Sequence, residues 1–366
     1  MKKIVVLFLS IFLITGCNTV NKPSKPVKPS EEVFIPKTHS FTLAMVGDAL
    51  IHQAVYADAK TGNSYDFRKM ITDVKKKIEP YDLAFYNQES ILGGSEIGLS
   101  HYPRFNAPYE VGDAMLDAGF NLVSLANNHT LDRGEPAIIN SCKYWNSKDV
   151  MVSGSFCDLD STKPKIREMN NISYTMLAYT TTTNGLQIPN GKSYYVSLYD
   201  KEKVKQDIES IRDKVDIVMV SMHWGNEYTH VPTYQQEEMA NYLSSLGVDI
   251  IIGHHPHVIQ PITKINQTVV IYSLGNFLSA QDALPRWIGM LASLKVTKTV
   301  NKDNSVIEIS DLKGELLYNN YNKTYINNFK VIPFENLNNN ILYNYENIKN
   351  EYNSIIRNLN KDIITN

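Results

Sequence analysis

The chain has 366 residues, and its 36 Lys and Arg against 38 Asp and Glu give a formal net charge of −2. An apolar content of 43% is enough for a buried core, so the sequence predicts a globular protein of one large or two ordinary domains. The near balance of charges offers no basic footprint, and we expect no nucleic-acid partner.

The first residues have the pattern of an export signal. Two lysines precede an apolar run at 4–14 that is too short to span a bilayer, and small residues lead to Cys17. This pattern resembles a bacterial lipoprotein signal over 1–17, which implies a lipidated Cys17 and an extracytoplasmic protein anchored to the cell membrane. The alternative is an ordinary signal peptide with an incidental cysteine. Residues 18–38 are rich in proline and are expected to form an extended tether.

The remaining chain alternates predicted strands and helices. Apolar runs predict strands at 41–46, 82–86, 120–126, 172–179, 216–222, 249–253 and 268–274. Helical spacing predicts helices at 67–78, 109–118, 135–148, 200–215 and 233–246. Such alternation predicts an α/β domain, here 39–300, with a largely parallel sheet. Within 301–366, short strands and a helical stretch at 341–359 are expected to pack on that domain.

Polar clusters follow five of the predicted strands. Their members are Asp48, Glu89, Asn128 with His129, His223, and the group of His254, His255 and His257. Each cluster alone could be a capping device, a turn or a solvated loop. Because ligands bind at the carboxyl edge of parallel strands, five clusters along that edge favour one shared site.

The proposed ligands mix carboxylate, amide oxygen and imidazole, which suits Mn, Fe or Zn better than Ca. They outnumber the needs of a single ion, so we expect two divalent ions that activate a water molecule. His129, with Asp132 three residues on to orient it, is expected to protonate a leaving group. His129 could instead be a plain metal ligand or a residue packed against the turn.

Two cysteines remain after Cys17. In an exported protein, Cys142 and Cys157 could form a disulfide or stay as free thiols, and the sequence leaves both possibilities open.

Six motifs, taken in order from about residue 41 to 290, resemble the CapA family, also called the poly-γ-glutamate capsule biosynthesis proteins. They are Val46-Gly-Asp48, Asn87-Gln-Glu89, Ala126-Asn-Asn-His129-Thr-Leu-Asp132, His223-Trp-Gly-Asn-Glu-Tyr228, Gly253-His-His255-Pro-His257 and Tyr272-Ser-Leu-Gly-Asn-Phe277. The resemblance implies a metallophosphatase-like four-layer α/β/β/α sandwich with a dinuclear site at the strand carboxyl ends. Two departures are that His52 follows Asp48 by four residues instead of two, and that Glu89 stands where an aspartate is usual.

The motifs also assign roles to single residues. The expected metal ligands are Asp48, His52, Glu89, Asn128, His223, His255 and His257. His255 is preferred to His254 because the family's usual form is Gly-x-His-Pro-His. The segment Phe105-Asn-Ala-Pro108, preceded by Arg104, also resembles the family and implies a substrate-side loop. The expected substrate contacts are Arg104, Asn106, Glu227, Tyr228, His254 and Asn276.

The resemblance implies a surface-anchored lipoprotein of poly-γ-glutamate capsule biosynthesis. We expect a metal-dependent hydrolase that acts on a phosphoester or a γ-glutamyl bond, with poly-γ-glutamate or a related anionic substrate and membrane proteins of capsule synthesis or export as partners. The alternatives are a non-catalytic polyglutamate-binding accessory subunit of a membrane synthesis and export complex, and a surface metallophosphatase unrelated to capsule.

Overall fold

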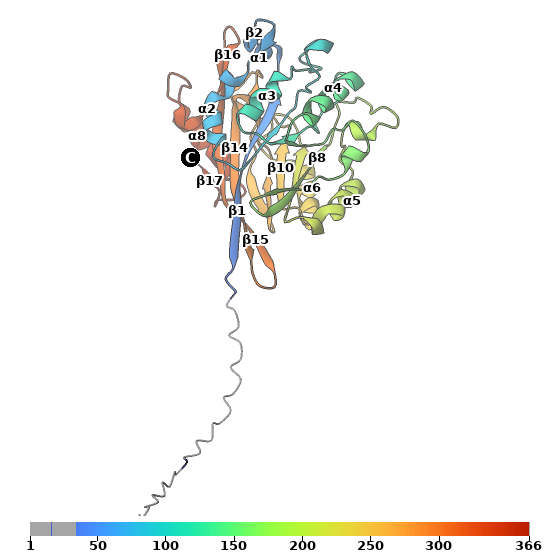
Figure 1. Ribbon diagram of the computed structural model, residues 1–366. Coiled ribbons are helices and arrows are strands. Elements are labelled where there is room, and N and C mark those ends of the chain that lie inside the picture. Colours follow the sequence, from blue (N-terminus) through green and yellow to red (C-terminus); the bar gives the residue numbers. More distant parts are fainter. Residues whose placement is uncertain (1–15, 17–33, 366) are drawn as a thin grey trace, which may run out of the picture. The chain divides into compact units, whose positions relative to one another are not determined.

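The computed structural model describes Gly16 and residues 34–365 (Figure 1). Apart from Gly16, the predicted signal peptide with Cys17 lies outside the described residues, as does most of the predicted tether. Within them, the first strand begins at Lys37, slightly before the expected domain boundary. The described part of the chain contains no helix with the length and apolar character needed to cross a membrane.

The first sheet has nine strands and is built around β1 (Lys37–Leu50). β1 pairs in parallel with β4 and β13 and antiparallel with β14. The strand order is β16-β15-β14-β1-β4-β5-β6, with β13 beside β1 and β17 beside β15. The other bounds are β4 (Leu83–Asn87), β5 (Leu122–Ser124), β6 (Met151–Ser153), β13 (Asn276–Ser279), β14 (Ile288–Val300), β15 (Ser305–Asn322), β16 (Asn327–Pro333) and β17 (Ile364–Thr365).

The second sheet has six strands in the order β11-β12-β10-β9-β8-β7. Its central strands β8, β9, β10 and β12 are parallel, and the edge strands β7 and β11 are antiparallel to their neighbours. Their bounds are β7 (Arg167–Met169), β8 (Ile172–Thr180), β9 (Ile217–His223), β10 (Ile250–His254), β11 (Ile262–Ile265) and β12 (Thr268–Ile271). A small ribbon pairs β2 (Lys60–Thr61) with β3 (Ser64–Tyr65).

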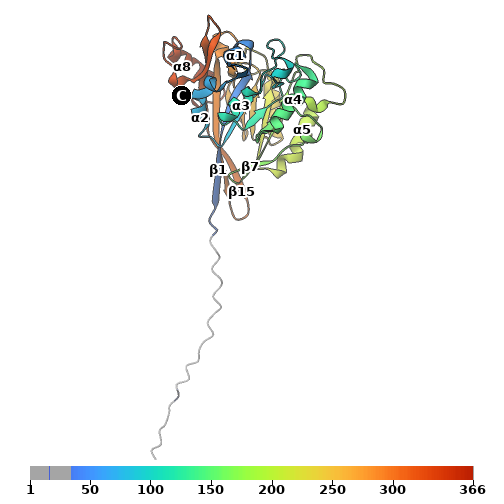
Figure 2. The ribbon, with the colours of Figure 1, turned by 45° about the horizontal axis from the view of Figure 1, so that its top comes forward.

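The described residues form eight α-helices, most of which cover the outer faces of the two sheets. They are α1 (Gln53–Asp58), α2 (Arg68–Ile78), α3 (Glu110–Asp117), α4 (Gly134–Asn146), α5 (Lys201–Ile211), α6 (Tyr234–Ser245), α7 (Leu284–Trp287) and α8 (Tyr345–Ile356). In Figures 1 and 2, α5 lies on the opposite side of the molecule from α2.

The apolar core forms three layers that follow the alternation of side chains along the strands. Between the sheets, Leu43 and Met45 of β1 belong to the same cluster as Met176 of β8. On the outer face of the first sheet, Val46 packs in one cluster with Val74 of α2. The outer face of the second sheet packs against α5 and α6. These layers confirm the four-layer α/β/β/α sandwich that the family resemblance implies.

The alternation of elements alone predicts one largely parallel sheet, and this expectation is wrong. The structure has two mixed sheets, because β14, β15 and β16 add antiparallel partners to one edge of β1, and β7 and β11 are antiparallel edges of the second sheet. Where short strands were expected within 301–366, residues 305–322 form one long strand, β15. β14 was not predicted, although it is the partner with the longest register on β1.

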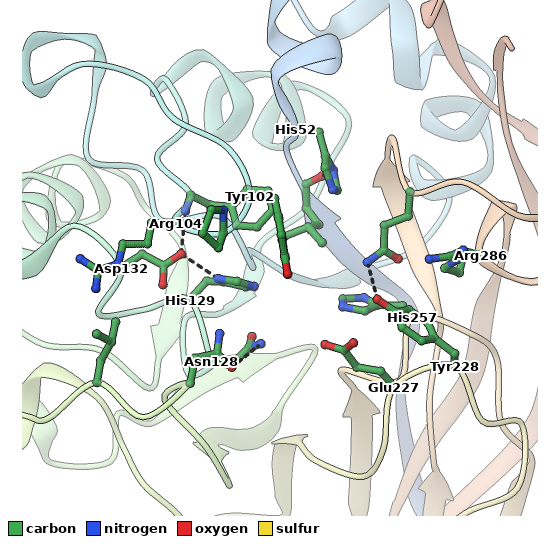
Figure 3. A pocket seen from close by; sticks show the side chains of 16 residues that line it. His52, Tyr102, Arg104, Asn128, His129, Asp132, Glu227, Tyr228, His257 and Arg286 are labelled. Carbon is green, nitrogen blue, oxygen red and sulfur yellow. Dashed lines mark hydrogen bonds and ion pairs between the residues drawn. The ribbon is translucent and has the colours of Figure 1, made fainter. Parts of the chain in front are cut away.

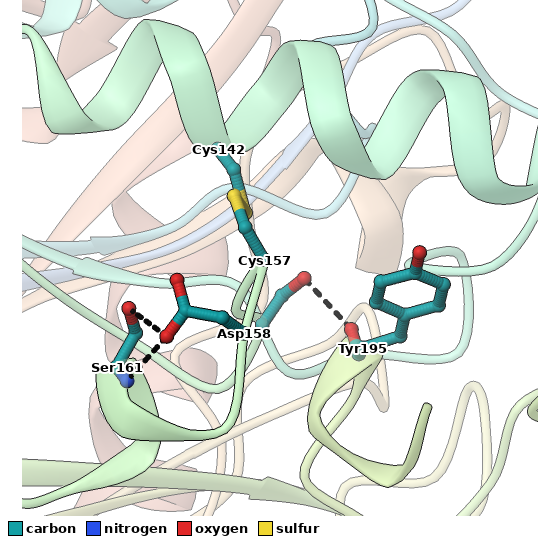
Figure 4. The surroundings of a disulfide bond; sticks show 6 residues. Cys142, Cys157, Asp158, Ser161 and Tyr195 are labelled. Atoms are coloured by element: carbon teal, nitrogen blue, oxygen red, sulfur yellow. Dashed lines mark hydrogen bonds between the residues drawn. A yellow bond between two sulfur atoms is a disulfide. The ribbon is translucent and has the colours of Figure 1, made fainter. Parts of the chain in front are cut away.

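The two cysteines form a disulfide, which decides the choice that the sequence leaves open (Figure 4). Cys142 lies in α4 and Cys157 in the loop after β6, with their Cα atoms 5.9 Å apart. The hydroxyl of Ser155 donates to the carbonyl of Tyr195 over 2.8 Å, and the amide of Phe156 donates to the carbonyl of Tyr194 over 3.0 Å. The disulfide therefore links the helix to a loop that is itself bound to the segment before α5.

Candidate metal centre and the cavity above it

The strand ends of both sheets meet at one place. Asp48 lies near the end of β1, Glu89 follows β4, and His223 and His254 end β9 and β10, and all four are completely buried. Two glycines permit this close approach. A Cβ at Gly47 would lie 1.8 Å from the carbonyl oxygen of Gly275, and one at Gly253 would lie 2.0 Å from that of Tyr272. Such distances exclude any side chain at either glycine.

Glu89 has a buried carboxylate with an unusual environment. No donor among residues 34–365 lies within hydrogen-bond distance of either of its oxygens. Its Oε1 instead lies 3.7 Å from Nε2 of His257 and 3.8 Å from Nε2 of His223. Ligand atoms of Glu89, His255 and His257 lie within 4.8 Å of one another. This group has the donor types and the separation that a divalent cation requires.

Electrostatics in this group also fit a cation. Burial raises the pKa of Glu89 well above its usual value, and the negative charges of Asp48 and Glu227 add to the effect. Burial lowers the pKa of His255 to about 3, with a contribution from His257. Its imidazole is therefore neutral near pH 7, with a lone pair for a metal. A cation would offset the cost of an unpaired buried carboxylate, so the residues fit the expected metal.

Asp48, whose role as a metal ligand stays a prediction, contacts His257. Its Oδ2 lies 3.2 Å from Nδ1 of His257, and its Oδ1 accepts from Nδ2 of Asn87 over 2.9 Å. Burial opposes ionisation of Asp48, but the hydrogen bond and charge of His257 outweigh it, and the pKa of Asp48 is lowered. A proton on Nδ1 of His257 leaves Nε2 free to face Glu89, which is the arrangement of a carboxylate-oriented metal ligand.

His223 connects the buried group to the other sheet. Its Nε2 lies 2.9 Å from Oδ1 of Asn128, and its Nδ1 lies 2.8 Å from Nδ1 of His254. Nε2 of His254 lies 2.6 Å from the hydroxyl of Ser221. Both ring nitrogens of His254 therefore have protein partners. His254 supports His223 from below.

The backbone of the histidine loop is held in a rare conformation. His255 has φ of 102° and His257 has φ of 59°. Non-glycine residues seldom adopt positive φ, and such strain is concentrated at functional sites. The turn at Pro256 aims both imidazoles away from β10 and towards Glu89.

His129 and Asp132 form a buried pair beside this group. Nδ1 of His129 lies 2.7 Å from Oδ2 of Asp132, and the backbone amide of Phe105 donates to the same oxygen over 2.6 Å. The Phe105 ring packs edge-on against His129 with a centroid separation of 4.6 Å. These contacts fix the ring of His129, and Figure 3 shows it facing the cavity.

A cavity of about 530 Å³ opens above the histidine and carboxylate group. His129 and His257 lie at its centre, and Arg104 and Arg286 lie on opposite sides (Figure 3). Tyr102, which is 73% exposed, stands at its mouth. The cavity is large enough for part of a chain molecule and is lined by groups of both charges.

The structure separates the expected substrate contacts into two sets. Arg104, Glu227 and Tyr228 line the cavity. Asn106 does not, because its side chain accepts from the amide of Gly93 and donates to the carbonyls of Gly94 and Gly98.

Two further expected contacts lie below the cavity. Asn276 donates to Gln281 and to the carbonyl of Arg286, and its Oδ1 lies 3.1 Å from Nδ1 of His257. His254 has no exposed surface, and its two ring nitrogens contact Ser221 and His223. The expectation of substrate contact is therefore wrong for Asn106, Asn276 and His254, because each side chain is buried and already bonded.

His52 lines the cavity wall, apart from the group around Glu89. Its Nδ1 lies 2.9 Å from the carbonyl oxygen of Leu50, and burial lowers its pKa to about 4. Sequence reasoning missed Tyr102, Gln281 and Arg286, which also line the cavity. They lie outside the strand-end motifs, and the only signal for Arg286 was a cation shortly after the Tyr272–Phe277 motif.

A family of known proteins matches the part of the chain that contains these strand ends. The model of a family described as "Bacterial capsule synthesis protein PGA_cap" matches residues 42–281. The chain is 33% identical over 167 residues to "PGA biosynthesis protein CapA" of Bacillus subtilis (strain 168), covering 45% of this chain and 44% of that protein. It is 27% identical over 273 residues to "Capsule biosynthesis protein CapA" of Bacillus anthracis, covering 70% of this chain and 62% of that protein.

The matched part of the chain thus spans less than two thirds of the length of either relative. Among solved structures, NAD nucleotidase (NadN) of Haemophilus influenzae superposes with a TM-score of 0.47 at 11% identity, covering 90% of this chain and 64% of that one.

Proposed function

This chain belongs to the family of bacterial capsule synthesis proteins, PGA_cap, and from that premise we propose that it serves capsule synthesis as a metal-dependent hydrolase. The proposed bond is a phosphoester or a γ-glutamyl amide. The names of the two curated relatives support the process, and the cavity supports the chemistry.

The observation that carries this proposal is the buried carboxylate of Glu89. It has no hydrogen-bond donor within residues 34–365 and is faced by imidazole nitrogens at 3.7 and 3.8 Å. Burying an unpaired charge costs on the order of several kcal/mol in desolvation. A carboxylate with no role beyond core packing would therefore not be expected in that position. A bound divalent cation would compensate it.

Glu89, His255 and His257 would hold one ion, and His223 with Asn128 would hold a second. Two divalent ions there, of Mn, Fe or Zn, would polarise the substrate and lower the pKa of a water molecule. Asp48 keeps His257 oriented through their 3.2 Å contact.

The protein's own acid in this scheme is His129. Asp132 holds the Nδ1 side of its ring at 2.7 Å, so Nε2 is directed into the cavity. In hydrolysis, water adds to the carbonyl or phosphoryl centre and the bond to the leaving atom breaks. A proton from Nε2 of His129 then goes to the leaving nitrogen or oxygen, and the products are an acid and an amine or alcohol.

We also propose that Cys17 carries a lipid anchor and that the domain works outside the cell membrane, beside membrane proteins of capsule synthesis or export. The pattern at 1–17 supports the anchor. The disulfide between Cys142 and Cys157 is compatible with an oxidising compartment.

The experiment is metal analysis of the purified domain from about residue 38 onward, beside a variant with His255→Ala and His257→Ala. Both proteins are then assayed on a phosphodiester and on poly-γ-glutamate. We expect about two equivalents of metal in the native protein and loss of metal in the variant. We also expect that the native protein cleaves one of the two substrates and that the variant cleaves neither.

Two results would contradict the proposal. Absence of bound metal in the native protein would overturn the metal centre. Bound metal and polymer binding without cleavage of either substrate would favour the accessory-subunit alternative, in which the site recognises polyglutamate for a membrane complex.

A further inference from the structure

One wall of the cavity is formed by the 281–287 segment, which lies between β13 and β14 and contains the short helix α7. Gln281 and Arg286 of this segment line the cavity. The last strand-end motif stops at Phe277 and the family model matches residues 42–281, so almost all of the segment lies beyond both. The contacts that hold this wall are therefore not covered by the motifs.

The segment has little regular structure of its own. α7 is a single turn of four residues, and Ala283 before it has a φ of 114°, which non-glycine residues rarely adopt. Nδ2 of Asn276 donates to Oε1 of Gln281 and to the carbonyl of Arg286, both over 3.0 Å. One isolated helical turn is not stable in water, so the position of the segment depends on contacts of this kind.

Trp287 holds the segment from its other end. Its Nε1 donates to the carbonyl of Gln281 over 3.0 Å and to the hydroxyl of Tyr321 over 3.1 Å. The first hydrogen bond joins the two ends of the segment, and the second joins the segment to β15. The indole therefore links the cavity wall to the long strand of the first sheet.

Lys323 follows β15 and covers this indole. Its Nζ lies 3.7 Å from the ring centroid of Trp287 and 3.2 Å from that of Tyr321. Nζ also donates to the carbonyl of Asn319 over 3.5 Å. Because an ammonium group is attracted to the faces of aromatic rings, its charge stabilises the same two rings that the indole hydrogen bond joins.

We propose that Lys323 is a positioning residue for the cavity. Its charge holds the ring of Trp287, and Trp287 in turn holds the 281–287 segment that carries Arg286. The guanidinium of Arg286, 4.7 Å from the ring centroid of Tyr228, is then already in place to bind an anionic group. The effect on substrate binding rests on the proposed function, whereas the holding of the segment does not.

The first test is limited digestion of the purified protein with trypsin, which cleaves after arginine and lysine. The bond between Arg286 and Trp287 reports on local opening of the segment, because cleavage follows the population of the open form. Lys323→Met keeps a long side chain without the charge. It should speed this cut about fivefold to thirtyfold, as for one lost cation–π contact. Mass spectrometry identifies the fragment that begins at Trp287.

Two matched variants serve as controls. Lys323→Arg keeps a cation over the rings and should bring the rate to within about twofold of the native value. Lys302→Met removes an exposed lysine from the turn between β14 and β15, and it should change nothing. Cleavage after Arg212, which follows α5, and thermal unfolding show whether a variant loosens the whole domain.

The second test is kinetic and uses whichever substrate the native protein cleaves. Both substrates considered above are anionic, so a displaced Arg286 should weaken their binding. Lys323→Met should raise KM about fivefold and leave kcat within about twofold, because His129 and the buried carboxylate and imidazole groups keep their contacts. Lys323→Arg should restore KM.

The outcomes separate this inference from the proposed hydrolysis. A native rate of cleavage after Arg286 in Lys323→Met overturns the inference. Equal acceleration after Arg286 and Arg212 also overturns it, because it would show a general loss of stability. A KM that stays at the native value overturns the link to binding. Selective cleavage after Arg286 that Lys323→Arg reverses supports the inference even if the native protein cleaves neither substrate, and then only the hydrolase proposal fails.

Discussion

His223 and His254 face each other through their Nδ1 atoms at 2.8 Å in the buried floor of the site. One nitrogen must donate and the other accept. The hydroxyl of Ser221, 2.6 Å from Nε2 of His254, can do either. If Nε2 of His223 binds a metal, its Nδ1 carries the proton and donates to His254, which in turn donates to Ser221.

This arrangement predicts that His254 controls metal affinity without touching metal. His254→Ala should weaken metal binding about 10–100-fold, as loss of a partner that orients a ligand does. Competition with a chelator measures the change. His39→Gln, on the first strand away from the cavity, is the control. An unchanged affinity in a folded His254→Ala protein would contradict the role.

Glu89→Gln should have opposite effects on the metal-free and metal-loaded protein. Burial and the neighbouring negative charges raise the pKa of Glu89, so its ionised form destabilises the metal-free fold near pH 7. In chelator the variant should melt at or above the temperature of the native protein. With added metal, the melting temperature of the variant should rise less than that of the native protein, because the variant has lost a metal ligand. Glu308→Gln, at an exposed position, is the control. A variant less stable in chelator would contradict the account.

His129→Ala should keep its metals and lose turnover by about 10²–10⁴-fold, the usual contribution of a general acid. Asp132→Asn should cost less, because it leaves the imidazole in place but removes the carboxylate that holds Nδ1. Steady-state rates beside metal content distinguish the two effects. A His129→Ala protein with full turnover would exclude His129 as the acid.

Metal-free protein should lose stability as the pH falls below about 6.5. Burial lowers the pKa of His52 and His254 to about 4 and that of His255 to about 3, whereas an unfolded histidine titrates near 6.5. The folded state binds fewer protons in that window. The free energy of unfolding therefore decreases as the pH decreases, by up to about 1.4 kcal/mol per pH unit for each group.

Glu89 opposes this trend, since its raised pKa lets the folded state take up a proton above the usual carboxyl range. One such group offsets about one histidine, so the net slope keeps its sign. Urea unfolding in chelator between about pH 7 and pH 5 measures the slope. A free energy of unfolding that stays level or rises over this range would contradict the assignment of neutral buried histidines.

Reduction of the disulfide should destabilise the domain. The bond between Cys142 and Cys157 closes a loop with a sequence separation of 15, for which the chain-entropy account gives about 3 kcal/mol. Thermal unfolding with and without reductant tests this. A protein with Cys142→Ser and Cys157→Ser should melt at the lower temperature in both conditions. A native protein indifferent to reductant would contradict the stabilising role.

The gathering of the candidate ligands at one edge was the most predictable feature of the molecule. Asp48, Glu89 and His223 each follow a buried apolar run, and the carboxyl ends of strands share an edge whichever strands are neighbours. The number of sheets was not predictable in this way, because a strand buried on both faces has the same continuous apolar pattern in either sheet. Pairing alone separates β8 to β12 from β1.

The roles of single residues were not predictable where sequence spacing does not show which way a side chain points. His254 and His255 are neighbours in the chain, yet one points below the site and the other towards Glu89, because His255 adopts a φ of 102°. The sequence of β14 did contain a strand signal. Its first half is apolar, and Lys295, Val296 and Thr297 then alternate between polar and apolar side chains. Arg286 lies just before that strand and was missed with it.

The close strand contacts at Gly47 and Gly253 divide the site into parts with different evolutionary freedom. Neither position can accept even a methyl group, so these two glycines cannot be replaced unless the strands move apart. Arg104 and Tyr102 stand on an exposed loop where replacement costs little structure. Changes at the rim can therefore alter which molecules the cavity accepts, while the buried strand ends keep their geometry.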